Sequence, residues 1–350
     1  MTPKERVAAV FSHKEPDLIP RWCGSSPEFW EKAKKFTGLA TDDELSIRFG
    51  DDFRRVYSVY RGPEHELHEG ATWCSPFGIE RAGIGYGQPT THPLAGATSV
   101  RDIEAYSWPS PDWIDVSTIG SQAAPYKDTY AILGGEWSPF WHDAIDLVGH
   151  ENLYYMMYDY PAAVSALFEN ITDYYYEGTR RSFEEAGDAI DIFFIGNDLG
   201  GQTGPLLGLE LFREFVLPSL KRLIDLGHRY NKSVMMHCCG GFRQLIPDLI
   251  DAGLDGLHAL QPDCAGMEPG GLKRDFGKDI VLNGAIDSHA ILIDGASPEY
   301  VYAETAKILN IMKPGGGYIC SASHDYILEE TPVENVLAMF DAVEQFGRYN

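Results

Sequence analysis

Short apolar runs alternate with helical stretches along most of this chain, and that alternation restricts the folds it can adopt. Parallel strands cannot be joined by tight hairpins, so a helix between successive strands predicts a parallel α/β sheet. The regular spacing after residue 190 favours a (β/α)8 TIM barrel over a doubly wound sheet, which would show the same alternation. The expected strands are Tyr130–Leu133, Asp191–Ile195, Ser233–Met236, Leu254–Leu260, Asp279–Leu282 and Gly317–Cys320.

Hydroxyl residues followed by proline and glutamate mark the expected starts of several helices. Thr2, Pro3 and Glu5 have the pattern of an N-cap, a first-turn proline and a capping-box glutamate, ahead of an apolar helical stretch. The same pattern occurs at Ser297–Tyr300 and Thr331–Glu334. We therefore expect an N-terminal helical extension and two helices on either side of the last strand.

A length of 350 residues suits either one large barrel or two smaller domains. No internal repeat, low-complexity run or Pro/Ser-rich linker marks a boundary, so we expect a single domain over residues 1–350. Residues 62–128 are rich in Gly, Pro, His and Trp and show little periodicity. Long irregular segments often carry binding or lid functions, so this one is expected to be an insertion that helps to cover the active site.

Charge and hydropathy exclude several classes of protein. The formal net charge is −24, which opposes binding to nucleic acid or to an anionic membrane. No apolar run is long enough to cross a bilayer, and the N-terminus lacks a secretory h-region, so we expect a soluble, cytoplasmic protein. The 6 cysteines are scattered apart from one adjacent pair, which suggests thiols or metal ligands rather than disulfides.

The densest group of reactive side chains follows the strand that begins near Ser233. Side chains alternate in an extended segment, so His237 and Cys239 point to one side and Cys238 to the other. An imidazole and a thiolate at a strand end are ligands that Zn²⁺ prefers, and the glycines that follow leave room beside a metal. A buried histidine between small hydrophobic thiols would give the same sequence.

A zinc site needs a third protein ligand, and three residues at or after the ends of expected strands could supply it. Cys264 follows the Leu254–Leu260 run, Cys320 lies within the last strand, and His324 lies just beyond it. Cys320 fits equally well in the core, whereas His324 falls where barrel enzymes place functional groups. We therefore expect His324 to complete the metal site.

Further polar residues follow strands, where a barrel would bring them to one face. Asp198 comes after the Asp191–Ile195 run and is a candidate acid, base or orienting group, although turn chemistry also places Asp and Asn there. Glu136 and Asp287 have the same relation to their strands and are further catalytic candidates. The expected substrate-binding residues are Asn197, Gln202, His142 and Gln261.

Several short motifs along the chain form a recognisable set, namely Glu15–Pro20, Gly196–Gly200, His237-x-Cys239-Gly240, Gly284-x-Ile286-Asp287, Gly315–Ile319 and Ser323-His324. Taken together, these motifs resemble the uroporphyrinogen decarboxylase superfamily over nearly the whole chain. The resemblance implies a TIM barrel.

Two kinds of chemistry occur in that superfamily. True uroporphyrinogen decarboxylases carry an N-terminal Arg-Gln-Ala-Gly-Arg segment that meets the substrate's carboxylates, but the matching segment here, Ile19–Gly24, offers only Arg21. The other branch contains zinc methyltransferases that act with corrinoid proteins and use an H-x-C pair plus a cysteine after the last strand. His237 and Cys239 match that pair, whereas His324 stands in the place of the cysteine.

The resemblance therefore implies a zinc-dependent methyltransferase, similar to O-demethylases, that moves a methyl group between a small substrate and a corrinoid. The corrinoid (cobalamin) would be free or carried by a partner protein. One alternative is a decarboxylase in which Asp198 or Asp52 stabilises a protonated intermediate, and another is a non-catalytic corrinoid or tetrapyrrole carrier. The residues that would suit a methoxylated aromatic methyl donor are Trp137, Phe140, Trp141, Tyr154, Tyr155 and Tyr158.

Overall fold

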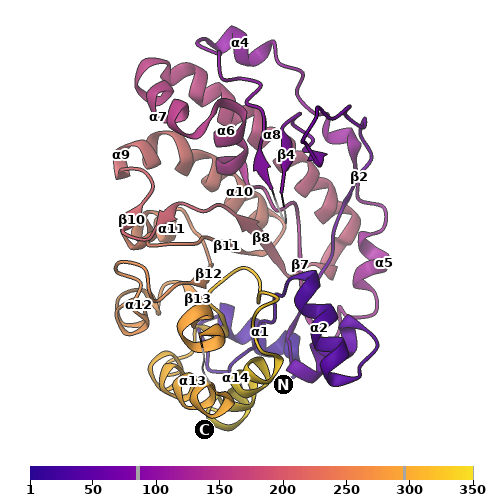
Figure 1. Ribbon diagram of the computed structural model, residues 1–350. Coiled ribbons are helices and arrows are strands. Elements are labelled where there is room, and N and C mark those ends of the chain that lie inside the picture. Colours follow the sequence, from indigo (N-terminus) through magenta and orange to yellow (C-terminus); the bar gives the residue numbers. More distant parts are fainter. Residues whose placement is uncertain (84–86, 295–296, 350) are drawn as a thin grey trace.

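The expected strands form the centre of the fold. The computed structural model describes residues 1–83, 87–294 and 297–349. Within these residues a seven-stranded sheet has only parallel neighbours, it includes every strand expected from the sequence, and helices surround it (Figure 1). In spatial order its strands are β1 (Phe53–Arg55), β7 (Ala131–Gly134), β8 (Ile192–Gly196), β11 (Ser233–His237), β12 (Gly256–Leu260), β13 (Val281–Ile286) and β14 (Tyr318–Ala322).

A short extended segment around Arg21 joins the two edges of this sheet. Arg21 forms a parallel bridge with Cys320 of β14, where Cys320 N donates to Pro20 O at 2.9 Å and Trp22 N donates to Cys320 O at 3.0 Å. On its other side, Arg21 O accepts a hydrogen bond from Asp52 N, next to β1, at 3.0 Å. The segment thus takes the eighth place, and the expected TIM-barrel-like α/β fold is confirmed.

The helix α1 (Pro3–Phe11) closes one end of the barrel. Its Val7 and Val10 belong to the same buried cluster as side chains from the strands. Lys4 holds this helix at the amino ends of the strands, because Lys4 N donates to Thr129 O at 2.9 Å and Lys4 Nζ lies 2.7 Å from Asp191. Burying an aliphatic side chain contributes about 1.5–3 kcal/mol, so this contact favours the closed barrel.

A second, larger core lies between the sheet and the outer helices. The longest of these helices, α8 (Pro161–Ala186), packs against several of the others. None of the helices in the described residues combines the length and apolar character needed to cross a membrane. The outer helices are α2 (Pro27–Thr37), α3 (Asp42–Phe49), α6 (Phe140–Val148), α7 (His150–Asp159), α8 (Pro161–Ala186), α10 (Leu217–Arg229), α11 (Ile246–Asp251), α12 (Pro269–Phe276), α13 (Pro298–Met312) and α14 (Val333–Phe346).

Two of the three expected helix caps are confirmed. Thr2 and Glu5 form a capping box at α1, and the Ser297 side chain accepts from Tyr300 N at the start of α13. At α14 the N-cap residue is Pro332, which offers no side-chain hydrogen bond, so the prediction that Thr331 caps this helix is wrong. The Thr331 side chain lies one residue too early to reach the first free amides.

The region expected to be an irregular insertion forms small elements outside the barrel sheet. Apart from residues 84–86, which lie outside the description, it contains the antiparallel strands β3 (Trp73–Cys74), β4 (Glu80–Ala82) and β5 (Gln88–Pro89), while β6 (Ile114–Asp115) pairs with β2 (Val59–Tyr60). Two short helices, α4 (Val100–Glu104) and α5 (Ile119–Ala123), pack against α8. Figure 1 shows β4 and α4 at the same end of the molecule as α6 and α7.

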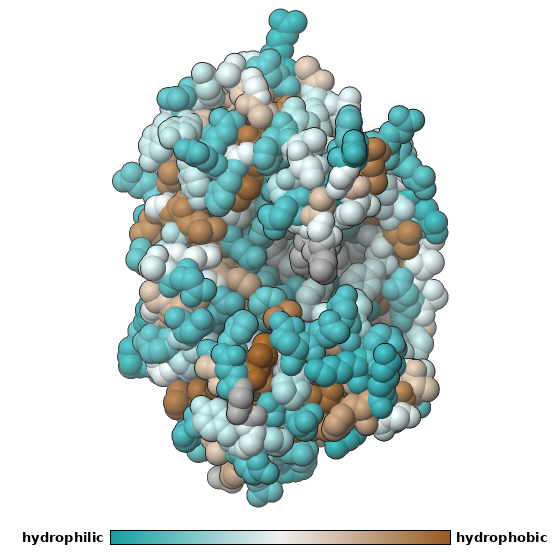
Figure 2. Space-filling model, in the orientation of Figure 1, coloured by the Kyte–Doolittle hydropathy of each residue, from teal (hydrophilic) through white to brown (hydrophobic). Residues whose placement is uncertain are grey.

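The viewed face of the molecule in Figure 2 is mostly hydrophilic. Figure 2 shows that hydrophilic residues cover most of the viewed face and that hydrophobic residues occur there in small, separate groups. With a formal net charge of −24, such a surface repels polyanions.

Candidate active site

Residues at the carboxyl ends of the strands line a cavity of about 450 Å³, together with residues from α6, α8 and the region around β3 and β4. Barrel enzymes place their functional groups at this end of the strands. Six of the expected catalytic, substrate-binding and metal-binding residues line this cavity: Glu136, His142, Asp198, His237, Cys239 and His324.

The centre of the cavity wall is a cluster of His237, Cys239 and Asp198. The Nε2 atom of His237 lies 3.3 Å from Cys239 Sγ and 3.3 Å from Asp198 Oδ1, and the three ligand atoms lie within 4.8 Å of one another. His237 ends β11, so the extended backbone brings Cys239 to the same side. Cys238 is buried on the opposite side, where its Sγ accepts from Leu199 N at 3.3 Å.

Two glycines allow the loops after β8 and β11 to approach closely enough to form this cluster. Gly240 has a φ of +84°, and a Cβ at this position would come within 2.3 Å of the backbone of Gly200. The close approach lets Cys239 N donate to Asp198 Oδ1 at 2.7 Å. The Gly-rich sequence after the H-x-C pair therefore brings a carboxylate from the neighbouring strand to the pair.

Hydrogen bonds between Asp198 and two histidines keep its carboxyl group ionised. Although burial opposes it, His142 and His237 together lower the pKa of Asp198 well below its ordinary range. His142 Nε2 lies 3.4 Å from Asp198 Oδ2. Burial raises the pKa of the Cys239 thiol, and the adjacent His237 opposes that effect. The cluster thus holds one carboxylate and one thiol beside the imidazole of His237.

The other ring nitrogen of His237 faces a histidine that the sequence analysis missed. The Nδ1 atoms of His237 and His258 lie 3.0 Å apart, and Asp325 Oδ1 lies 3.9 Å from His237 Nδ1. Burial lowers the pKa of His258 well below its ordinary value, and the positive charge of His237 adds to this effect. The available signal was a histidine within the apolar run Leu254–Leu260, which becomes a buried strand.

A second set of lining residues, called the opposite wall, comes from the region around β3 and β4 and from α6 and α8. Its members are Trp73, Ser75, Pro76, Arg81, Asp143, Asp146 and Tyr175. Arg81 forms an ion pair with Asp146 of α6, and its guanidinium carbon lies 5.3 Å from the centre of the Trp73 ring. An insertion that covers the active site is expected here from the sequence, but these residues are not. The region lacks the helix or strand periodicity that would indicate which way their side chains point.

Two carboxyl groups that line the cavity are strongly desolvated. Asp143 accepts a hydrogen bond from Tyr175 Oη at 2.5 Å, and burial raises the pKa of Asp143 to about 6 despite that bond. Glu136 follows β7 and accepts from Ser58 Oγ at 2.7 Å, and burial raises the pKa of Glu136 as well. Each of these carboxyl groups can therefore hold a proton more readily than a free one.

Four of the expected site residues lie beside the cavity, not among the described residues that line it. Asp287 caps the short helical turn η5 (Ser288–Ile293), where it accepts from His289 N and Ala290 N. Asn197 is buried and holds the loop after β7, because it accepts from Trp141 N and donates to Ser138 O. Their catalytic and substrate-binding roles stay predictions, as do those of the two glutamines described next.

Gln261 supports the loop that carries Cys239, and the side chains of Gln261 and Gln202 both contact Cys264. Gln261 Oε1 accepts from Gly240 N at 2.6 Å, directly after Cys239. Cys264 Sγ lies 3.6 Å from the amide oxygens of both glutamines. Cys264, one of the three candidate third ligands, is thus engaged with these amides.

The other candidate third ligands are also outside the donor cluster. His324 lines the cavity, but its Nδ1 lies 3.2 Å from Tyr326 N, and among the described residues it is not part of the grouped donors. Cys320 is buried within β14, and burial raises the pKa of its thiol to about 12. The structure instead groups Asp198 with the H-x-C pair. The assignment of His324 as a ligand stays a prediction.

The nature of these donors fits a zinc ion. Imidazole nitrogen, thiolate sulfur and carboxylate oxygen are the three ligand types that Zn²⁺ takes in proteins, and catalytic zinc sites use three protein ligands and leave one position open. His237 Nε2, Cys239 Sγ and a carboxylate oxygen of Asp198 meet this requirement at the wall of a cavity. A substrate in the cavity would reach the open position.

The aromatic residues expected to contact a substrate separate into four groups. Trp137 lines the cavity, and its ring centre lies 5.6 Å from that of His237. Phe140 and Trp141 are buried in the core, whereas Tyr155 and Tyr158 are exposed on α7. Tyr154 donates to Leu206 O outside the cavity lining. The aromatic side chains that do line the cavity are Trp73, Trp137, Tyr175 and Tyr326.

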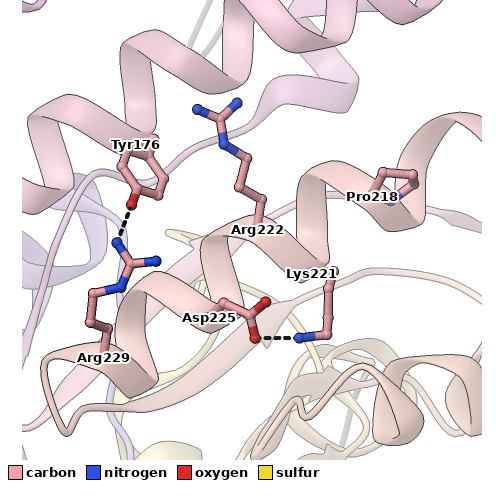
Figure 3. Close-up of a pocket in the computed structure, with 6 residues that line it drawn as sticks. All are labelled: Tyr176, Pro218, Lys221, Arg222, Asp225 and Arg229. Atoms are coloured by element: carbon pink, nitrogen blue, oxygen red, sulfur yellow. Dashed lines mark hydrogen bonds and ion pairs between the residues drawn. The ribbon is translucent and has the colours of Figure 1, made fainter.

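A second cavity, of about 510 Å³, lies on the outer surface between α8 and α10 (Figure 3). Its charged groups already have partners: Lys221 pairs with Asp225, Arg222 with Asp173, and Arg229 donates to Tyr176 Oη at 2.8 Å. None of the described strand-end donors lines it. The cavity at the barrel mouth is therefore the candidate active site.

Comparisons with known proteins agree with the architecture. A family model described as uroporphyrinogen decarboxylase (URO-D) matches residues 98–346. Curated uroporphyrinogen decarboxylases are 25% identical over 240 residues in Magnetococcus marinus and 25% identical over 235 residues in Dechloromonas aromatica. Each alignment covers 67% of this chain, and the chain spans about 60% of the length of these relatives.

A solved structure is similar over the whole chain. It is a methyltransferase from Methanosarcina mazei, with a TM-score of 0.67, 20% sequence identity and coverage of 99% of both chains. At this identity the likeness shows the fold.

Proposed function

The chain belongs to the uroporphyrinogen decarboxylase family, and from that premise we propose that it is a zinc-dependent methyltransferase that moves a methyl group between a small substrate and a corrinoid. The observation that carries the proposal is the grouping of His237, Cys239 and Asp198 at the wall of the cavity. The similar Methanosarcina mazei protein is described as a methyltransferase, which adds support.

His237, Cys239 and Asp198 would hold the zinc ion. When bound, the metal supplies Lewis-acid activation, which lowers the pKa of a thiol acceptor or polarises the oxygen of a methyl ether. In this proposal Asp198 acts as a ligand and not as a general acid. His142 holds the Asp198 carboxylate in place through its contact with Oδ2 at 3.4 Å.

The other residues of the cavity would bind the substrate and manage its proton. Trp137 lies beside His237 and offers a flat surface to an aromatic methyl donor. Glu136 holds a proton more readily than a free carboxyl group because it is buried, so it could protonate an oxygen that loses its methyl group. A corrinoid protein would present its cofactor at the mouth of the barrel.

The charge of the cavity weighs against the alternative of a decarboxylase. Among the described residues that line it, Arg81 is the one arginine or lysine, and it is already paired with Asp146. Asp52, the other candidate for that chemistry, is buried in an ion pair with Arg6 at 2.5 Å, outside the lining of the cavity. A carboxylated substrate would instead meet Glu136, Asp143, Asp146, Asp198 and Asp325.

The proposal is tested by mixing the zinc-loaded protein with cob(I)alamin and guaiacol, a neutral methoxylated phenol. Release of catechol, with loss of the cob(I)alamin absorbance, is the expected result, and the variant His237→Ala is expected to release none. A screen of aromatic ethers and thiols that detects no methyl transfer, together with release of carbon dioxide from a carboxylated substrate, would favour the decarboxylase. Corrinoid binding without any turnover would favour the carrier.

A further inference from the structure

We infer that His258 is a positioning residue, which fixes the tautomer and orientation of His237 so that His237 Nε2 can bind the metal. This inference rests on the zinc site of the proposed function. It concerns a histidine that does not line the cavity itself, within the part of the chain that the structure describes.

The two nitrogens of the His237 ring face different surroundings. Nε2 points to the cavity side, where Cys239 Sγ and Asp198 Oδ1 each lie 3.3 Å away. Nδ1 points into the barrel, where it lies 3.0 Å from Nδ1 of His258. The parallel register of β11 and β12 places His237 directly opposite His258, so the backbone itself sets this pairing.

Metal binding then determines where the protons lie. A neutral imidazole that gives its Nε2 lone pair to a metal carries its proton on Nδ1. The nearest acceptor for that proton is Nδ1 of His258, because Asp325 Oδ1 is 3.9 Å away, beyond hydrogen-bond distance. His258 must therefore leave its own Nδ1 unprotonated and carry its proton on Nε2.

Apart from His237, the surroundings of His258 give no reason for a histidine at this position. Its ring is fully buried, with ring centres 4.7 Å from Trp22 and 5.3 Å from Phe194. Its Nε2 has no hydrogen-bond partner among the described residues. A buried polar atom without a partner is costly, and a phenylalanine or leucine would fill this apolar position without that cost. The hydrogen bond to His237 gives a reason for a histidine at this position.

Second-layer partners of metal-bound histidines commonly tune metal affinity, and their loss weakens it by about 10- to 100-fold. Accordingly, His258→Phe is expected to weaken zinc binding by about 10- to 100-fold, measured by competition with a chromophoric chelator. The visible spectrum of the Co²⁺-substituted protein should shift as well. His258→Gln, whose amide oxygen can accept the hydrogen bond, should restore a large part of the affinity.

Asn283→Leu is the matched control. Asn283 is buried, lies opposite His258 in β13, and accepts from Ser321 Oγ at 2.7 Å. Removing this polar side chain disturbs the barrel interior without removing the partner of His237, so zinc affinity should stay within about twofold of the unsubstituted protein. Thermal unfolding of each variant shows whether it folds.

A measurement on the unsubstituted protein tests the inference without any variant. Nitrogen-15 NMR of the metal-loaded protein should show His258 protonated on Nε2 and His237 protonated on Nδ1. The opposite tautomer of His258, an unchanged zinc affinity in His258→Phe, or two zinc ions per chain would overturn the inference. The last result would place a metal between His237 and His258, which also gather with Asp325. If the unsubstituted protein binds no zinc, the proposed function and this inference both fail, whereas the other three outcomes leave the proposed function intact.

Discussion

The two walls of the cavity differ in origin and in chemistry. The barrel wall presents His237, Cys239 and Asp198 from the ends of neighbouring strands, close together and open to the cavity. The opposite wall, built by β4, α6 and α8, presents Arg81 paired with Asp146, and Asp143 bonded to Tyr175. The barrel wall therefore carries the donor atoms of the proposed metal site, while the opposite wall already satisfies many of its own polar groups.

This difference suggests that the barrel wall carries the chemistry and that the opposite wall selects the substrate. Parallel strands hold their ends in fixed register, which gives the precision that a metal site needs. The small elements of residues 62–128 are held by side-chain contacts with α6 and α8 and shape the space around the substrate. Changes in the barrel wall should abolish chemistry, and changes in the opposite wall should alter substrate binding or stability.

The largest effect is expected from His237→Ala or Cys239→Ala. The first change removes a nitrogen ligand and the second removes a sulfur ligand. In either variant the protein should lose its zinc, and methyl transfer should fall by about 1000-fold or more. Metal analysis and the guaiacol assay measure the two losses. The control is Cys238→Ala, because Cys238 faces away from the cavity. Equal losses in that variant would mean that the loop had collapsed, and full activity in His237→Ala would remove the metal from the mechanism.

The second prediction concerns the opposite wall. Because the pKa of Asp143 is about 6 in the folded protein, against an ordinary value of 3.8, the folded state binds its proton more tightly than the unfolded state does. Protonation of Asp143 therefore stabilises the folded protein below pH 4. As pH rises through about 6 this stabilisation should be lost, and the free energy of unfolding should fall by about 3 kcal/mol. The free energy of unfolding of Asp143→Asn, measured with urea, should not fall with pH in this range. The same pH dependence in the unsubstituted protein and in Asp143→Asn would show that another group causes it.

A smaller effect should distinguish the candidate third ligands. Asp198→Ala is expected to weaken zinc binding by at least about tenfold, since a ligand should matter no less than an outer partner. His324→Ala and Cys320→Ala should change it little, because neither side chain belongs to the donor cluster of the described residues. Chelator competition on all three variants makes the comparison. If zinc affinity fell in His324→Ala alone, His324 would be the third zinc ligand, as the sequence predicts.

The smallest effect is expected from Trp73→Leu. This change removes an aromatic surface from the opposite wall, so KM for an aromatic donor should rise by about fivefold, equivalent to about 1 kcal/mol, while zinc content stays the same. Tyr155→Leu is the control, because Tyr155 is exposed on α7 and does not line the cavity. A loss of metal in Trp73→Leu would show that the two walls are not independent.

Sequence reasoning predicted the parts of this molecule that depend on local pattern. The apolar runs predicted the later strands of the sheet, and alternation in an extended segment predicted that His237 and Cys239 share a side. The strand-like segment at Arg21 was not predicted, because it is short and gains its place only by pairing with β14 and the residue before β1. Local pattern cannot show such long-range pairing.

The candidate site shows the same limit. Asp198 was identified as a functional residue, but its approach to Cys239 depends on two glycines in different loops. His258 was missed because it reaches His237 only through the register of β12 with β11. Asp325 was missed because its approach to His237 depends on the path of the loop after β14. Trp73 and Arg81 come from a region without periodicity, so nothing in the sequence gave their direction.

The most direct test of the central claim is the zinc content of the protein purified without added metal, measured by plasma mass spectrometry beside the His237→Ala variant. About one zinc ion per chain is expected in the unsubstituted protein and a large loss in the variant, since three protein donors form one site. A folded protein that contains no zinc, and that binds none when it is supplied, would rule out the proposed zinc site.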